Sequence, residues 1–139
     1  MIEESFGTVA LRKKDDKWQV FLIKHKEAKH WGFPKGHKNL GENEKIAALR
    51  ELKEETNLDL KEVVSNTPFI EHYKYQKDAL LRSKKVTYFL IEAYGKEKLD
   101  PVEIEDGKWC FFDEASNLIT FEQSKITLEK VAKYLAENE

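Results

Sequence analysis

The sequence predicts a mixed β-sheet packed between helices, the architecture of an α+β protein or of an α/β/α sandwich. Segments rich in β-branched and aromatic residues, typical of strands, occur before and between two segments with the residue spacing of helices. One strand segment is apolar on both faces, as expected for a strand inside a covered sheet. At 139 residues the chain is long enough for one buried core, so we expect a single domain over residues 1–139.

The first two predicted strands form a hairpin. An extended segment begins at Phe6 and ends at the polar run 13–17. The next strand covers 18–23, where both alternating sets of positions are mainly apolar, and we expect it to be central in the sheet. Residues 25–42 contain glycines and Pro34 but no sustained period, so they are predicted to form a loop.

A helix is predicted to follow this loop. Asn43 is a good N-cap, and Glu44 is placed favourably against the helix dipole. Asn57 is expected to end the helix, because asparagine tolerates the left-handed backbone conformation of a helix terminus.

Three further strands are predicted in the second half of the chain, over residues 69–75, 86–94 and 108–112. A charged loop over 95–107 separates the last two. A final helix is predicted to begin at Thr120, because its spacing to Gln123 fits a capping box. Its apolar stripe consists of Leu128, Val131, Ala132 and Leu135.

Composition excludes several classes of protein. Charged residues make up 36% of the chain, but acids and bases nearly cancel and leave a net charge of -2, which favours neither DNA nor an anionic membrane as a partner. Cys110 is the only cysteine, which rules out an intrachain disulfide and argues against a cysteine-based zinc site. No apolar stretch approaches the roughly 20 residues that span a bilayer, and the first residues lack the features of a signal peptide. We therefore expect a cytoplasmic protein.

Carboxylates crowd one side of the first predicted helix. A helical projection groups Glu44, Glu51, Glu54 and Glu55 on that side. The opposite side, where we expect the core, carries Ile46, Leu49 and Leu52. Like charges three and four residues apart cost roughly a few tenths of a kcal/mol per pair. The alternative interpretation is a solvated helix face, but a glycine-containing loop with its own lysine directly precedes it. The pattern favours a hard divalent cation, Mg²⁺ or alternatively Mn²⁺, shared with a polyphosphate.

The loop and helix together resemble the Nudix hydrolase signature. That signature is a glycine, five residues, a glutamate, seven residues, and then Arg-Glu-hydrophobic-x-Glu-Glu-x-Gly-hydrophobic. The chain matches it at Gly36, Glu42, Arg50, Glu51, Leu52, Glu54, Glu55 and Leu58. It departs at Asn57, where the family usually has glycine. Because asparagine is the best substitute for glycine in a left-handed cap, we expect this departure to cost little stability.

The resemblance implies the Nudix fold, a mixed sheet between helices, and metal-dependent cleavage of a nucleoside diphosphate linked to another group. The implied metal ligands are the Gly36 carbonyl and the carboxylates of Glu51, Glu54 and Glu55. Arg50 would orient these glutamates, and Glu42 would support the site or a further metal. A glutamate from the later acidic loop often approaches the metals in Nudix enzymes and can serve as the general base, a role that the resemblance leaves open among the glutamates. Spacing indicates Glu103, with Glu105 as its substitute and a solvated loop as the alternative.

Outside the signature, the chain is similar over almost its entire length to the asymmetric diadenosine tetraphosphate hydrolases. The matching elements are His30-Trp31 before residues 34–37, the segment 84–90, and Trp109 followed by Glu114-Ala115 and Leu118. The resemblance implies hydrolysis of diadenosine tetraphosphate to ATP and AMP by a monomer, with a nucleotide as the bound partner.

The same resemblance implies a set of substrate-binding residues. Tyr75 would stack an adenine, although it or neighbouring Tyr73 could equally serve sheet packing. Lys35 and Lys84 would hold phosphates, with a solvated charge as the alternative for either. Further candidates are His30, His37 and Phe121, and for the histidines loop packing is the alternative.

Two other activities and two roles without catalysis compete with this interpretation. Removal of pyrophosphate from the 5′ end of RNA, or cleavage of another nucleoside diphosphate derivative, would use the same signature, but an RNA enzyme should carry a basic track. A nucleotide-sensing domain without activity usually lacks one of the signature glutamates, whereas Glu51, Glu54 and Glu55 are all present. A scaffold whose acidic helix binds a basic partner would hydrolyse neither substrate.

Overall fold

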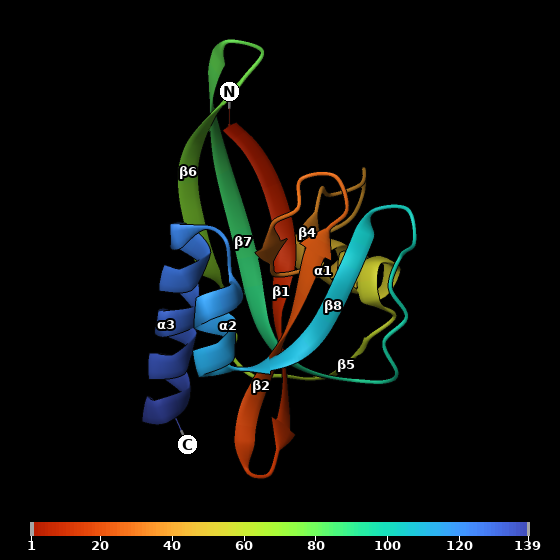
Figure 1. Ribbon diagram of the computed structural model, residues 1–139, viewed down its shortest axis with the longest axis vertical. Coiled ribbons are helices and arrows are strands. Elements are labelled where there is room, and N and C mark those ends of the chain that lie inside the picture. Colours follow the sequence, from red (N-terminus) through yellow and green to blue (C-terminus); the bar gives the residue numbers. More distant parts are fainter. Residues whose placement is uncertain (1, 139) are drawn as a thin grey trace.

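Two long strands in parallel form the centre of the computed structural model, which describes residues 2–138 (Figure 1). The strands of the sheet are β1 (Ile2–Lys14), β2 (Lys17–His25), β3 (Trp31–Gly32), β4 (Lys35–Gly36), β5 (Asp59–Val63), β6 (Phe69–Lys77), β7 (Leu80–Tyr94) and β8 (Ile104–Phe111). The helices are α1 (Glu44–Thr56), α2 (Phe112–Leu118) and α3 (Glu122–Glu137). Strand β1 runs parallel to β7 and antiparallel to β2 and β4. Strand β7 is antiparallel to β5 and β6, and β2 to β3 and β8, so the sheet is mixed.

Alternation along the central strands builds a separate core on each face of the sheet. In β2, Val20 and Leu22 pack on the face covered by α2 and α3, whereas Phe21 and Ile23 pack on the face covered by α1. Side chains at successive strand positions point to opposite faces, so a strand apolar at both sets of positions must be covered on both sides. The predicted sandwich of a mixed sheet between helices and the central place of this strand are therefore confirmed (Figure 1).

The predicted loop over residues 25–42 contains two strands that the sequence pattern missed. Strands β3 and β4 are two residues long each, too short for a periodic signal, and they exist through pairing with β2 and β1. The prediction also missed β5, a largely polar strand beside β7, and the short helix α2, which has no side-chain cap. Strand β8 begins at Ile104, within the segment predicted as a charged loop.

The caps of α1 agree with the sequence, but the predicted start of the last helix is wrong. The Asn43 side chain accepts a hydrogen bond from Ile46 N at 2.8 Å, and Asn57 has a φ of 66°, in the left-handed region. Helix α3 begins at Glu122, after Thr120. The Thr120 hydroxyl accepts from Trp31 N at 2.9 Å and so ties β3 to the segment before α3. Ala132, predicted in the apolar stripe, is exposed.

No helix within residues 2–138 combines the length and the apolar character needed to cross a membrane.

Candidate active site

Only part of the acidic side of α1 faces into the protein: Glu55 is buried and Glu51 half-buried, whereas Glu44 and Glu54 are exposed. The predicted core side is confirmed at Leu52, which is buried, and is wrong at one position. Ile46, expected in the core, is 53% exposed, whereas Glu55 is only 3% exposed. The buried face of α1 includes the small residues Ala47 and Ala48, which let the helix approach the sheet closely. A helical projection separates the acids from the large apolar side chains. It does not show that the side carrying the small residues Ala47 and Ala48 would lie against the sheet.

Gly36 in β4 leaves room for the Glu51 carboxylate. A Cβ atom at residue 36 would overlap that carboxylate, because the side chain of Glu51 lies directly over the glycine. Strand β4 is itself held by pairing with β1, where Gly36 stands opposite Phe6. The close contact between β4 and α1 therefore requires glycine at position 36.

Glu55 is a buried carboxyl group whose negative charge, when it ionises, few groups in the protein would offset. Its Oε1 accepts a hydrogen bond from Lys35 N at 3.0 Å. Burial, and then the negative charges of Glu51 and Glu103, raise the pKa of Glu55 to about 9. Burial also raises the pKa of Glu51, although Arg50 acts in the opposite direction. This pair of glutamates would be stabilised in its charged form by an added cation.

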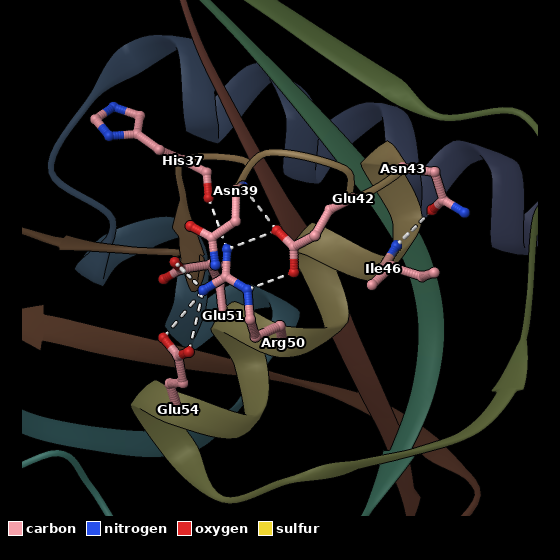
Figure 2. A network of polar contacts seen from close by, with 8 residues as sticks. All are labelled: His37, Asn39, Glu42, Asn43, Ile46, Arg50, Glu51 and Glu54. Carbon is pink, nitrogen blue, oxygen red and sulfur yellow. Dashed lines mark hydrogen bonds and ion pairs between the residues drawn. The ribbon is translucent and has the colours of Figure 1, made fainter.

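Arg50 lies among the acids and binds several of them at once (Figure 2). Its guanidinium donates to Glu42 at 2.7 and 3.0 Å, to Glu51 at 2.9 Å and to Glu54 at 3.1 Å. It also donates to the carbonyl oxygen of His37 at 2.8 Å. A helical projection does not place Arg50 among these acids, but its long side chain reaches them. Paired donors to carboxylates are strong and directional, so Arg50 fixes the loop before α1 to the acidic face.

The acidic face supplies suitable ligands for a divalent cation. Within residues 2–138, no group of three carboxylate, imidazole or thiol side chains converges on a point where a metal ion could bind. The carboxylates of Glu51 and Glu54 both turn toward Arg50 instead (Figure 2). Their oxygen atoms, with those of Glu55 and the Gly36 carbonyl, are the hard donors that Mg²⁺ prefers. The raised pKa values of Glu51 and Glu55 are also consistent with a site that gains from positive charge.

A cavity of about 440 Å³ lies beside the acidic face. Five predicted substrate-binding residues line it, namely His30, Lys35, Tyr75, Lys84 and Phe121. Its wall also includes residues without a sequence motif or predicted only to pack, namely His25, Trp31, Glu71, Tyr73, Tyr88 and Ser124. Lys35 joins the cavity to the acidic face, because its backbone N–H donates to Glu55 while the residue itself lines the cavity.

The cavity is rich in rings and in positive charge. Burial and the neighbouring charge of Lys84 lower the pKa of Lys35 to about 8. Burial, followed by the charges of His30 and Lys35, lowers the pKa of His25 to about 4, so its imidazole is neutral near pH 7. The ring of His30 stands 4.9 Å from that of His25 and 4.9 Å from that of Phe121. Flat apolar faces beside two lysines suit a base attached to phosphates.

Glu3 in β1 gathers three of the predicted substrate-binding side chains and was missed by the sequence analysis. Tyr75 donates its hydroxyl proton to Glu3, His37 lies 3.2 Å from it, and Lys84 lies 3.3 Å from it. The hydrogen bond from Tyr75 is the main cause that lowers the pKa of Glu3 to about 2. His37 is 68% exposed and does not line the cavity. The parallel register of Glu3 with Lys84, which brings them together, could not be read from the sequence.

The two candidate glutamates of the acidic loop differ in their surroundings. Glu105 forms ion pairs with Lys24, at 2.9 Å, and with Lys29, and these lysines lower the pKa of Glu105 to about 2. Glu103 precedes β8, and its negative charge raises the pKa of both Glu51 and Glu55. Of the two, Glu103 is therefore the one that acts on the acidic face.

This fold, with a loop and helix that place glutamates against a glycine, defines a member of the Nudix family. The chain belongs to that family: residues 1–130 match the model of the NUDIX domain, and the chain is a Nudix hydrolase. Enzymes of this family typically depend on a divalent metal.

Known relatives narrow the class further. An asymmetrical bis(5'-nucleosyl)-tetraphosphatase of Rattus norvegicus is 35% identical over 108 residues, which cover 76% of this chain and 72% of the relative. The enzyme of the same description from Caenorhabditis elegans is 28% identical over 138 residues, covering 98% of this chain and 99% of the relative. The crystal structure of a C. elegans Ap4A hydrolase binary complex superposes with a TM-score of 0.77 at 27% identity, covering 97% of this chain and 98% of that one.

Proposed function

We propose that this protein hydrolyses dinucleoside polyphosphates, chiefly diadenosine tetraphosphate to ATP and AMP. The observation that carries the proposal is the position of Lys35, which bonds the acidic face through its backbone and lines the ring-walled cavity. A substrate with a base in the cavity would thus have its phosphates beside the carboxylates. Relatives that act on bis(5'-nucleosyl) tetraphosphates match most of the chain and support the same substrate.

Each predicted residue has a role consistent with its contacts. Tyr75 and Phe121 would flank the base, while Lys35 and Lys84 would bind phosphates, with His30 on the cavity wall and His37 at the Glu3 cluster. Arg50 would hold Glu51 and Glu54 in position, and Glu42 would hold Arg50. Glu103 would add negative charge near Glu51 and Glu55.

Glu51, Glu54 and Glu55, with the Gly36 carbonyl, would hold Mg²⁺, or alternatively Mn²⁺. When bound, the cation would neutralise phosphate oxygens and make a coordinated water more nucleophilic. The protein itself would bind the tetraphosphate bridge, orient a terminal phosphorus toward the attacking water, and supply carboxylates able to accept its proton. Positioning and charge would do most of the work, since cleavage of a phosphoric anhydride needs no covalent intermediate on the protein.

Steady-state kinetics with two substrates tests the proposal. Diadenosine tetraphosphate should be cleaved much faster than triphosphorylated RNA, and Glu51→Gln should reduce turnover by at least about 100-fold while nucleotide binding persists. Glu44→Gln, at an exposed glutamate of the same helix, is the matched control and should keep full turnover. Faster cleavage of the RNA would favour the RNA 5′-pyrophosphohydrolase. Turnover of neither substrate, with nucleotide binding retained, would favour a sensor.

We also propose that the protein acts in the cytoplasm as a monomer with a nucleotide as its partner. Sedimentation equilibrium at micromolar concentration should give a mass near 16.3 kDa. A mass near twice that value would refute the monomer.

A further inference from the structure

A carboxylate occupies a position in β6 where a ring or an apolar side chain would be expected. Glu71, Tyr73 and Tyr75 are alternate residues of β6, so their side chains point to the same face of the sheet, and all three line the cavity. Phe69, the preceding residue of this row, packs against the core. Glu71 itself is only 5% exposed. Packing alone therefore does not account for a glutamate in this row.

Glu71 is held by two neutral hydroxyl groups from α3, the helix that lies beside β6 (Figure 1). The Ser124 hydroxyl donates to its Oε1 at 3.2 Å, and the Thr127 hydroxyl donates to its Oε2 at 2.8 Å. None of the ion pairs formed within residues 2–138 includes Glu71. A buried carboxylate that is bonded only to neutral donors is costly, and burial raises the pKa of Glu71. Each of its oxygen atoms retains capacity to accept a further hydrogen bond.

The cavity wall around Glu71 suits a nucleobase. The rings of Tyr73 and Tyr75 stand 6.3 Å apart in the same row, and Phe121 adds another ring. Lys35 and Lys84 line the same cavity and would direct phosphates toward the acidic face. A base bound among these rings needs partners for the polar groups on its edge, and the carboxylate of Glu71 lies on the wall that could supply acceptors.

We propose that Glu71 is a specificity-determining residue whose carboxylate accepts N–H hydrogen bonds from the edge of the base bound in this cavity. The inference rests on the proposed function, because it takes a dinucleotide as the substrate. Guanine offers two adjacent donors, its ring N1–H and its 2-amino group, to the two oxygens of the carboxylate. Adenine offers its amino group beside a ring nitrogen that is an acceptor. When a dinucleotide offers both bases, the carboxylate thus favours guanine over adenine in the cavity, without excluding adenine from a substrate that carries only adenine. A glutamine, with one donor and one acceptor, favours adenine.

The mixed dinucleotide with adenosine at one end and guanosine at the other provides an internal competition. Asymmetric cleavage yields either ATP with GMP or GTP with AMP, and the ratio of these pairs reports which base occupies the cavity. We expect Glu71→Gln to change that ratio by about tenfold, the size of one hydrogen bond to a charged group. Thr127→Val removes one supporting hydroxyl but keeps the carboxylate, and it should leave the ratio within about twofold. An unchanged ratio in Glu71→Gln would overturn the assignment, because a structural role lowers both product pairs alike.

A second measurement uses the wild-type protein and does not depend on hydrolysis. Titration calorimetry should give about tenfold tighter binding of GMP than of IMP, whose base lacks the 2-amino donor. Equal affinities would overturn the assignment. If GMP binds more tightly but no dinucleotide is cleaved, the base contact of Glu71 stands and only the proposed hydrolytic function fails.

Discussion

Replacement of Glu55 by glutamine should stabilise the metal-free protein while abolishing its activity. Burial and neighbouring acids raise the pKa of Glu55 from 4.5 to about 9, so the folded state holds a proton that the unfolded state releases above about pH 4.5. The contribution of Glu55 to the free energy of unfolding is fully present below pH 4.5 and is lost progressively as the pH rises toward 9. Each pH unit in that window lowers the free energy of unfolding by about 1.4 kcal/mol.

Urea unfolding in the presence of a chelator measures this effect. Between about pH 6 and about pH 8.5 the wild type should lose about 3 kcal/mol through Glu55, and Glu55→Gln should remove that loss. Glu51 shifts in the same direction, so a smaller slope should remain in the variant. Glu54→Gln is the matched control, because the side chain of Glu54 is 56% exposed, and it should retain the wild-type slope.

Addition of Mg²⁺ should reverse the order of stabilities at high pH. A cation that binds ionised Glu55 displaces the proton, so Mg²⁺ should raise the unfolding midpoint of the wild type more at about pH 8.5 than at about pH 6. The variant should respond weakly at either pH. The reasoning would be refuted if the variant kept the full pH dependence of the wild type, or if it were less stable than the wild type at high pH without metal.

Three other substitutions test separate contacts. Gly36→Ala places a methyl group where the Glu51 carboxylate lies and should reduce kcat by about 100-fold or more, with far-ultraviolet circular dichroism unchanged; near-normal kcat would contradict the contact. Asn57→Gly relieves the left-handed φ of 66° but loses the bond to Lys96 O, so urea unfolding should detect a change of less than about 1 kcal/mol in either direction. Glu3→Gln removes the charge paired with Lys84 and should lower KM for the tetraphosphate by about threefold; a higher KM would show that Glu3 assists binding.

Local patterns predicted much of this fold because their causes are local. The apolar residues at both sets of alternating positions in β2 predicted a strand covered on both faces. Helix α1 begins after Asn43, whose side chain caps it, and ends at Asn57, whose backbone is left-handed, as expected. Elements that depend on pairing with distant segments, such as β4 and β5, carry no periodic signal of their own. The same holds for Thr120, which bonds Trp31 instead of capping a helix.

The sequence predicted which residues belong to the candidate site more fully than it predicted how they are arranged in space. Spacing placed the glutamates on one helix face, but the burial of Glu55 depends on how closely α1 approaches the sheet. Glu3 and Glu71 join the site through strand register and through the packing of α3, and neither belongs to a motif. Contacts across the sheet of this kind set the chemistry of the cavity wall, and a single sequence does not encode them in any short pattern.

Hydrolysis of diadenosine tetraphosphate in ¹⁸O-labelled water, with Mg²⁺ and with a chelator, tests the central claim most directly. The claim is that the carboxylates of α1 hold a cation that activates water against a terminal phosphorus of the bridge. Mass spectrometry should find ATP and AMP as products, with the label in AMP alone and no turnover after chelation. Turnover that persists in the chelator, or ADP as the only product, would contradict it.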